Sequence, residues 1–200
     1  MQKSQREYRA ELLEICETAP HTYEWQTKES IWAKPDHQNY RSLLSNNSIM
    51  QRSMKLTARR GGAYPDITLH HALRFDGLHC FLTDIDVDSP DWYVLTAAIV
   101  EPATCEAERT TTGMGELNRP DVERGEPLVF PGVLTEKYQR QTQGDPMSYS
   151  EARYVLVTPK CISLVVGEIV NIGDQPYEAV IAHTLDPYKN EFEVLRRRDN

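Results

Sequence analysis

Histidine and cysteine side chains flank a tight Asp76-Gly77 turn, and from there they could bind a metal ion. His70-His71 precede the turn and His79-Cys80 follow it. Two imidazoles and a thiolate would suit zinc. However, adjacent residues on a strand point to opposite faces, so only one member of each pair can reach a shared site. No fourth ligand follows at a suitable spacing, so we expect no metal site here.

Three aspartates follow the turn with the D-x-D-x-D spacing that opens a calcium-binding loop. They are Asp84, Asp86 and Asp88. The sixth position of such a loop needs glycine and the twelfth a bidentate glutamate, but Ser89 and Leu95 stand there. Alternation with Ile85 and Val87 favours a strand with one solvated, acidic face. The sequence therefore predicts an acidic surface and not a calcium site.

No catalytic motif stands out along the chain. The sequence lacks G-x-S-x-G, the P-loop, G-x-G-x-x-G and H-E-x-x-H. We therefore expect a protein that is not an enzyme and needs no cofactor. Two other hypotheses stay open: a metal-dependent hydrolase that uses His70, His79 and nearby aspartates, and a carbohydrate- or protein-binding β module.

Charge is unevenly distributed along the chain. The net charge of −8 argues against a basic nucleic-acid reader and against a protein that binds anionic membranes. Residues 61–100 carry six aspartates and one basic residue, whereas residues 1–60 carry ten basic and seven acidic residues. Five acidic residues could face the lumen of a ring-shaped assembly or an interface: Asp76, Asp84, Asp86, Asp88 and Asp91. Candidate basic interface residues are Arg52, Lys55, Arg59 and Arg60.

The cysteine pattern and the hydropathy indicate a soluble protein made in the cytoplasm. Four cysteines are scattered without a C-x-x-C pair, as is typical of free thiols in a reducing compartment. The first residues have no apolar signal-peptide core, and no apolar run is long enough for a membrane span.

Residues 67–100 predict a three-strand meander. The expected strands are 67–75, 79–87 and 92–100, and Asp76-Gly77 between alternating runs is a strong hairpin signal. In the second strand, alternation places four residues on one face: Phe81, Thr83, Ile85 and Val87. Three strands with one apolar face need more strands to close a core.

The rest of the chain predicts an all-β fold of small β-barrel modules. Tyr8, Leu12, Ile15 and Cys16 recur at helical spacing, so we expect a short N-terminal helix over 4–19. Glycine- and proline-rich residues 103–153 predict an extended arm, which is either a mobile linker or a segment that orders on a partner. The expected divisions are 1–20 (helix), 21–102 (first barrel module), 103–153 (arm) and 154–200 (second β-rich module packed on the first). The plan of 73–81 returns weakly in 170–177, which suggests two related modules.

The order of four short segments resembles the head–tail adaptor, or head-closure, proteins of tailed bacteriophages. The segments are Ile31-Trp32-Ala33, Met54 to Arg59, His71 to Gly77 and Phe81 to Ile85. The resemblance covers roughly residues 22–100, and its motifs are mostly strand-and-turn patterns. This chain is about twice the usual length for that family, and the arm has no counterpart in it.

The resemblance implies a structural virion protein of the head–tail connector, or neck. Such a protein is a small β-barrel that forms a ring, here expected to hold six or twelve subunits, between the portal or adaptor protein and the tail terminator or tail tube protein. Viral DNA would pass through the lumen without sequence-specific contact, because an acidic wall repels phosphate. The alternatives are a tail terminator, another neck or tail component, or a non-viral β-sandwich binding module.

Overall fold

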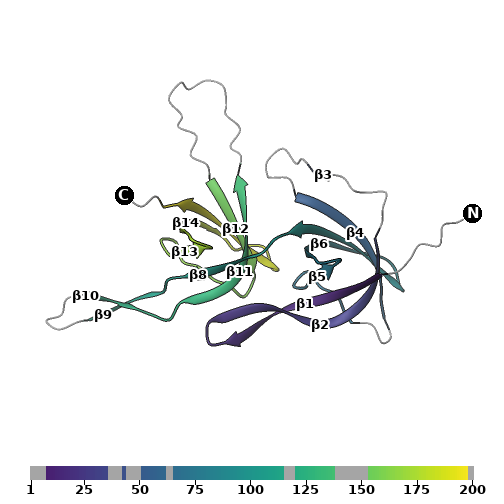
Figure 1. Cartoon of the computed structure of the whole chain (residues 1–200), viewed down its shortest axis with the longest axis horizontal. Helices are drawn as coiled ribbons and strands as arrows, with labels where there is room; N and C mark the ends of the chain where they lie inside the picture. The colour runs from purple at the N-terminus through teal and green to yellow at the C-terminus, as the bar shows by residue number, and fades with distance from the viewer. Residues whose placement is uncertain are drawn as a thin grey trace, which may run out of the picture. The chain divides into compact units, whose positions relative to one another are not determined.

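Every regular element that the computed structural model describes is a β-strand (Figure 1). The described residues are 8–35, 42–43, 51–61, 65–114, 120–137 and 153–197. The all-β prediction is therefore confirmed. No helix in these ranges is long and apolar enough to cross a membrane. The chain divides into two compact units, 1–16 with 25–102, and 17–24 with 103–200.

The first unit contains six long or medium strands and one short one. They are β1 (Tyr8–Ala19), β2 (Thr22–Pro35), β3 (Ser42–Leu43), β4 (Gln51–Arg59), β5 (Ala72–Phe75), β6 (Leu78–Ser89) and β7 (Trp92–Val100). Neighbouring strands pair in the order β2-β1-β5-β6-β7-β4, and β4 pairs in turn with β2. The expected meander is therefore present as β5-β6-β7, joined by the two-residue turn Asp76-Gly77. Both turn residues have positive φ, which is the reason that Asp-Gly suits this hairpin.

The second unit repeats this plan. Its strands are β8 (Ala103–Ala107), β11 (Leu128–Lys137), β12 (Arg153–Pro159), β13 (Ile169–Ile172), β14 (Gln175–His183) and β15 (Lys189–Arg196). Strands pair in the order β11-β8-β13-β14-β15-β12, and β12 pairs in turn with β11. A two-stranded ribbon, β9 (Thr110–Met114) and β10 (Pro120–Arg124), lies between β8 and β11 in the sequence.

The two units have the same strand order, and they match in detail at one hairpin. β5-β6 and β13-β14 each turn through two residues. β6 has a β-bulge at Thr83, and β14 has one at Val180, in each case five residues after the strand begins. The faint sequence likeness of 73–81 and 170–177 therefore coincides with equivalent strands.

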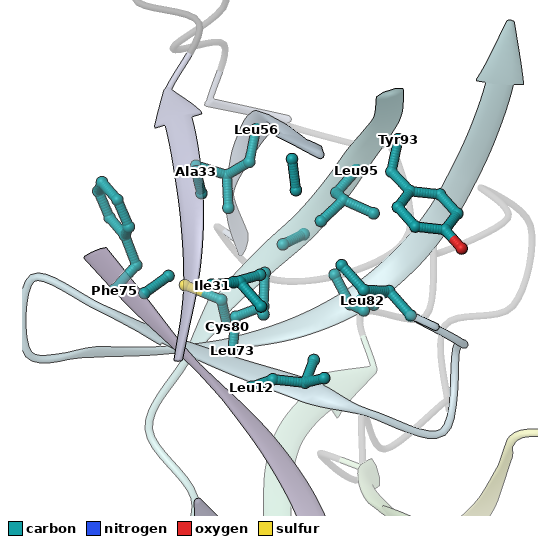
Figure 2. Close-up of a cluster of buried hydrophobic side chains, with 14 of the residues drawn as sticks. Leu12, Ile31, Ala33, Leu56, Leu73, Phe75, Cys80, Leu82, Tyr93 and Leu95 are labelled. Atoms are coloured by element: carbon teal, nitrogen blue, oxygen red, sulfur yellow. The ribbon is translucent and has the colours of Figure 1, made fainter. Parts of the chain in front are cut away.

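Each unit has its own apolar core. The first core includes Leu12, Ile31, Leu56, Leu73 and Leu95, whose side chains converge from five strands (Figure 2). The second core centres on large buried side chains of four strands and the connection before β13: Phe130, Leu156, Val170, Phe192 and Ile162. Residues 17–24, the tip of the β1-β2 hairpin, belong to the second unit, where Thr22 pairs with Val129 of β11.

The expected N-terminal helix is wrong over the described residues 8–19, which form β1. Tyr8, Leu12 and Cys16 are four residues apart, and a spacing of four fits a helix turn and also two strand repeats. Ala10, Leu12 and Leu13 are buried in β1. Pairing with β2 and β5 therefore decides the structure, not the local pattern.

Much of the expected 103–153 arm lies in strands of the second unit. β8 and β11 pair with each other, and Cys105, Ala107, Leu128 and Phe130 are buried in its core. The boundary between the units therefore falls near 103 and not near 153. Residues 115–119 and 138–152 of the expected arm lie outside the described ranges.

The predicted alternation of β6 is wrong because of the bulge. Cys80 and Leu82 are buried in the core, Thr83 is exposed, and Ile85 packs against the core. Leu82 is opposite Ala97 and Asp84 is opposite Thr96, so Thr83 is one residue too many for a regular ladder. Phe81 therefore lies on the face opposite Ile85, and Val87 is 45% exposed.

Candidate interaction surface

The outer face of β4, β7 and β6 carries basic residues on β4 and acidic residues on β6, on either side of β7. We call this surface the charged face. Its residues, as the strand register aligns them, are Lys55 and Arg59 on β4, Trp92, Val94 and Thr96 on β7, and Asp84 and Asp86 on β6. Their neighbours Leu56, Tyr93 and Leu95 point into the core, so strand alternation turns these residues outward. Basic and acidic columns therefore flank an uncharged one.

One row across the charged face shows the separation. Lys55 is opposite Thr96, and Thr96 is opposite Asp84. Neighbouring strands lie about 4.8 Å apart, so Lys55 and Asp84 are separated by roughly 10 Å. Both side chains are exposed, and among the described residues neither has an ion-pair partner. These charges are therefore available to another molecule.

The bulge at Thr83 fixes which residue is presented. Thr83 Oγ1 donates a hydrogen bond to the carbonyl oxygen of Thr96 at 3.1 Å. This bond anchors the extra residue on the strand that carries Thr96. As a result Asp84, and not Thr83, completes the row with Lys55.

Two arginines at the end of β4 lie over aromatic rings of β7. The guanidinium carbon of Arg59 is 5.3 Å from the ring centroid of Trp92, and that of Arg60 is 5.4 Å from the ring centroid of Tyr93. These cation–π contacts hold both arginines at the surface. They are therefore positioned by the strand pair itself.

Trp32 extends the face onto β2. Its neighbours Ile31 and Ala33 are buried, whereas the Trp32 side chain is 51% exposed. Ala33 is opposite Ala58, which places Trp32 beside Arg59. Trp, Arg and Trp then follow one another across three strands, a composition that is typical of energetically important interface residues.

The other predicted acidic and basic residues lie apart from these rows or cannot be placed. Asp76 is exposed in the β5-β6 turn, and Asp91 is exposed in the β6-β7 turn, where its carbonyl oxygen accepts a hydrogen bond from the Arg60 N–H. Asp88 and Arg52 belong to β6 and β4, but their side chains lie outside the described set. The structure thus brings together Lys55, Arg59, Asp84 and Asp86 on one face.

His79 and Cys80 do not share a site, because Cys80 is in the core and His79 is on the opposite face. The His79 ring lies 5.6 Å from the ring of Trp25 and 5.3 Å from that of Phe81. Burial, with a smaller contribution from Arg74, lowers the pKa of His79 to about 4.

His71 is buried beside a lysine. Its Nδ1 accepts a hydrogen bond from the backbone N–H of Thr68 at 3.0 Å, and its Nε2 lies 3.3 Å from Lys28 Nζ. Lys28 also pairs with Glu14 at 3.0 Å. Burial and the Lys28 charge lower the pKa of His71. Within the described ranges, no three His, Cys, Asp or Glu side chains are grouped so as to hold a metal ion.

A buried polar network fixes one loop of the second unit. Asn190 is 4% exposed, and its Nδ2 donates to the carbonyl oxygens of Lys160 and Ile162. Lys160 Nζ donates to Asn190 Oδ1 and to the carbonyl oxygens of Thr184 and Asp186. The loop between β14 and β15 is therefore held rigidly.

Neither the aromatic part of the charged face nor the Lys160–Asn190 network was predicted from the sequence. Trp32 and Trp92 are 60 residues apart in sequence, and their strands lie on either side of β4. The sequence shows a tryptophan in each of these two strands. Only the strand register shows that both rings lie beside the same arginine, Arg59. No family model, curated protein or solved structure matches this chain.

Proposed function

We propose that each unit is a small closed β-barrel and that the chain is a ring-forming structural subunit of a phage head–tail connector. One observation carries the proposal. The segments that resemble head-closure proteins fall on β2, β4, β5 and β6 of a single compact unit. The family implies one small barrel, and these segments supply most of the strands of one such unit.

The pairing pattern supports barrel closure. In each unit the sixth strand pairs back to the first, which leaves the ring of six strands without a free edge. A barrel of this size is filled by side chains and not by a channel. A passage for DNA would therefore lie between subunits of a ring and not inside one barrel.

The overall charge supports passage of DNA without adhesion. The chain has a net charge of −8, so a ring of copies repels the phosphate backbone at close range. In this proposal the protein has no catalytic role and no cofactor. Its partners are further copies of itself, the portal or adaptor protein on one side and a tail terminator or tail tube protein on the other.

The test is assembly with defined partners. The purified chain is mixed with the portal protein, and separately with the tail tube protein, of the phage that encodes it. Light scattering after size exclusion gives the mass, and electron microscopy shows whether rings form. A ring bound to the portal supports the connector role, and a ring bound only to the tail tube supports a tail terminator. Failure to form a ring with either partner contradicts both and leaves the non-viral binding module.

A further inference from the structure

We propose that the charged face is a two-fold contact between two copies of this chain, with the symmetry axis parallel to β7. The contact does not depend on the proposed connector function. A two-fold contact uses the same patch on both copies and cannot by itself close a ring. Surfaces that form a ring must therefore lie elsewhere.

The order of the charged columns favours a two-fold contact. On the charged face the basic column of β4 lies on one side of β7, and the acidic column of β6 lies on the other. Rotation by 180° about an axis along β7 exchanges the two sides and turns a second copy face to face with the first. It preserves position along the strand, so each row meets the same row of the other copy.

That operation places opposite charges against each other in one row. Lys55 of one copy meets Asp84 of the other, and the reverse pair forms by symmetry. Val94, Thr96 and Trp92 meet near the axis, and all three are only partly exposed. The contact therefore has an uncharged centre and charged flanks, which is the usual anatomy of a protein interface.

Other arrangements of two copies are less favourable. A two-fold axis in the plane of the contact but perpendicular to β7 would place the basic column against the basic column of the other copy, and like charges at that distance repel. A head-to-tail contact would need the basic and the acidic residues on different sides of the molecule. Both columns lie on one sheet face only about 10 Å apart, so they cannot form such a contact. The two-fold contact with its axis along β7 is the arrangement that pairs both columns at once.

The size of the face predicts a weak complex. Four neighbouring strands, β2, β4, β7 and β6, and three outward rows give a surface on the order of 400 Å² per copy. Stable interfaces bury about 800 Å² per partner, so this contact lies at the low end. Dimerisation should therefore depend on protein concentration, and salt should weaken it because the flanking pairs are exposed.

The test uses two single charge reversals, Lys55→Asp and Asp84→Lys. In a dimer of the first variant aspartates face aspartates, and in a dimer of the second lysines face lysines. Each variant alone should dimerise at least tenfold more weakly than the wild type. Mixed together, one copy of each should form a heterodimer, because both of its charge pairs are then attractive. In the proposed register the wild type and the mixture should therefore both associate more tightly than either variant alone.

Sedimentation velocity from low micromolar to near-millimolar concentration gives the dissociation constants, and native mass spectrometry of a size-tagged mixture counts the heterodimer. Asp174→Lys is the control for Asp84→Lys, because it makes the same charge change in an exposed turn of the second unit. Circular dichroism verifies that each variant is folded. A wild type that stays monomeric throughout overturns the proposal. So does a mixture that associates no better than its components, even if rings form with the portal.

Discussion

The rings of Trp25 and His79 are in contact, and each carries a buried nitrogen without a hydrogen-bond partner in the described part of the chain. The nitrogens are Trp25 Nε1 on β2 and His79 Nε2 on β6, and the two ring centroids are 5.6 Å apart. Phe81 packs edge-on against both rings. A charged imidazole would be poorly solvated here, and the positive charge of Arg74 also disfavours it.

We expect stability to fall on acidification because of His79. Its pKa is about 4 in the folded chain and near 6.5 when unfolded, so the unfolded chain binds more protons between these values. The neutral His79 stabilises the folded chain fully above pH 6.5. This stabilisation is lost as the pH falls from about 6.5 to about 4, and the total loss in unfolding free energy is at most ~3 kcal/mol. Urea unfolding of the wild type and His79→Phe over this range measures it. The difference in unfolding free energy between the two should change with pH.

The control for this measurement is His70→Gln, which changes an exposed histidine of the same unit. Its unfolding free energy should follow the wild type across the same pH range. A difference between wild type and His79→Phe that is independent of pH would show that His79 is solvated in the folded chain.

Gly132 of β11 leaves room in the second core for the side chains of Cys105 and Leu156. A Cβ at this position would lie 2.8 Å from Cys105 Sγ and 2.8 Å from Leu156 Cδ1, and both neighbours are fully buried. Gly132→Ala should therefore destabilise the second unit by about 1–3 kcal/mol through overpacking. Adding Cys105→Ala removes one of the two clashes and should restore part of the loss. Denaturant unfolding of both single variants and the double variant gives the coupling, and additive losses would contradict this account.

Gly77 supplies the positive φ that the β5-β6 turn needs. Its φ is +75°, and a Cβ there would meet no atom within 4 Å, so any cost of substitution comes from the backbone alone. Gly77→Ala should lower the unfolding free energy by about 1 kcal/mol, and Gly77→Asn should cost less because asparagine tolerates this conformation. Thermal unfolding of the two variants ranks them. Equal stability of alanine and wild type would mean that the turn changes conformation freely.

The hairpins of the fold were predictable because their signals are local. Asp76-Gly77 between alternating runs predicted β5-β6, and the faint likeness near Gly173 marked the equivalent β13-β14 pair. β1 was not predictable from its pattern, since a four-residue apolar spacing fits both a helix and a strand. β8 was missed because its buried residues, Cys105 and Ala107, are small and contribute little to an apolar count.

The charged face was predictable only in part. The acidic residues stand close together in the sequence, so their shared strand could be inferred. Their relation to Lys55 depends on β4 pairing with β7 and on an extra residue, Thr83, that breaks the strand alternation. A bulge leaves no clear pattern in one sequence, and therefore neither the row nor its partner could be assigned before the structure.

Asn190 is the centre of the network that fixes the β14-β15 loop, and its loss should be costly. Asn190→Ala removes both donors to the carbonyl oxygens of Lys160 and Ile162 and one acceptor of Lys160 Nζ. Unsatisfied buried groups of this kind should lower the unfolding free energy by about 3 kcal/mol. Asn171→Ala is the control, because its one described side-chain contact, to Glu108, is exposed and long at 3.5 Å, so its cost should stay below about 1 kcal/mol.

Hydrogen exchange separates a loop effect from a global one. The amides of Tyr188 and Lys189 donate to Asp186 Oδ1, and the carbonyl oxygen of Asp186 accepts from Lys160 Nζ. In Asn190→Ala these two amides should lose protection beyond the global loss of stability, because Lys160 is no longer held in place. Asn190→Asp retains the acceptor for Lys160 but loses both donors, so it should keep the loop protected while still destabilising the unit. Equal loss of protection throughout the second unit would show that Asn190 only supports the core.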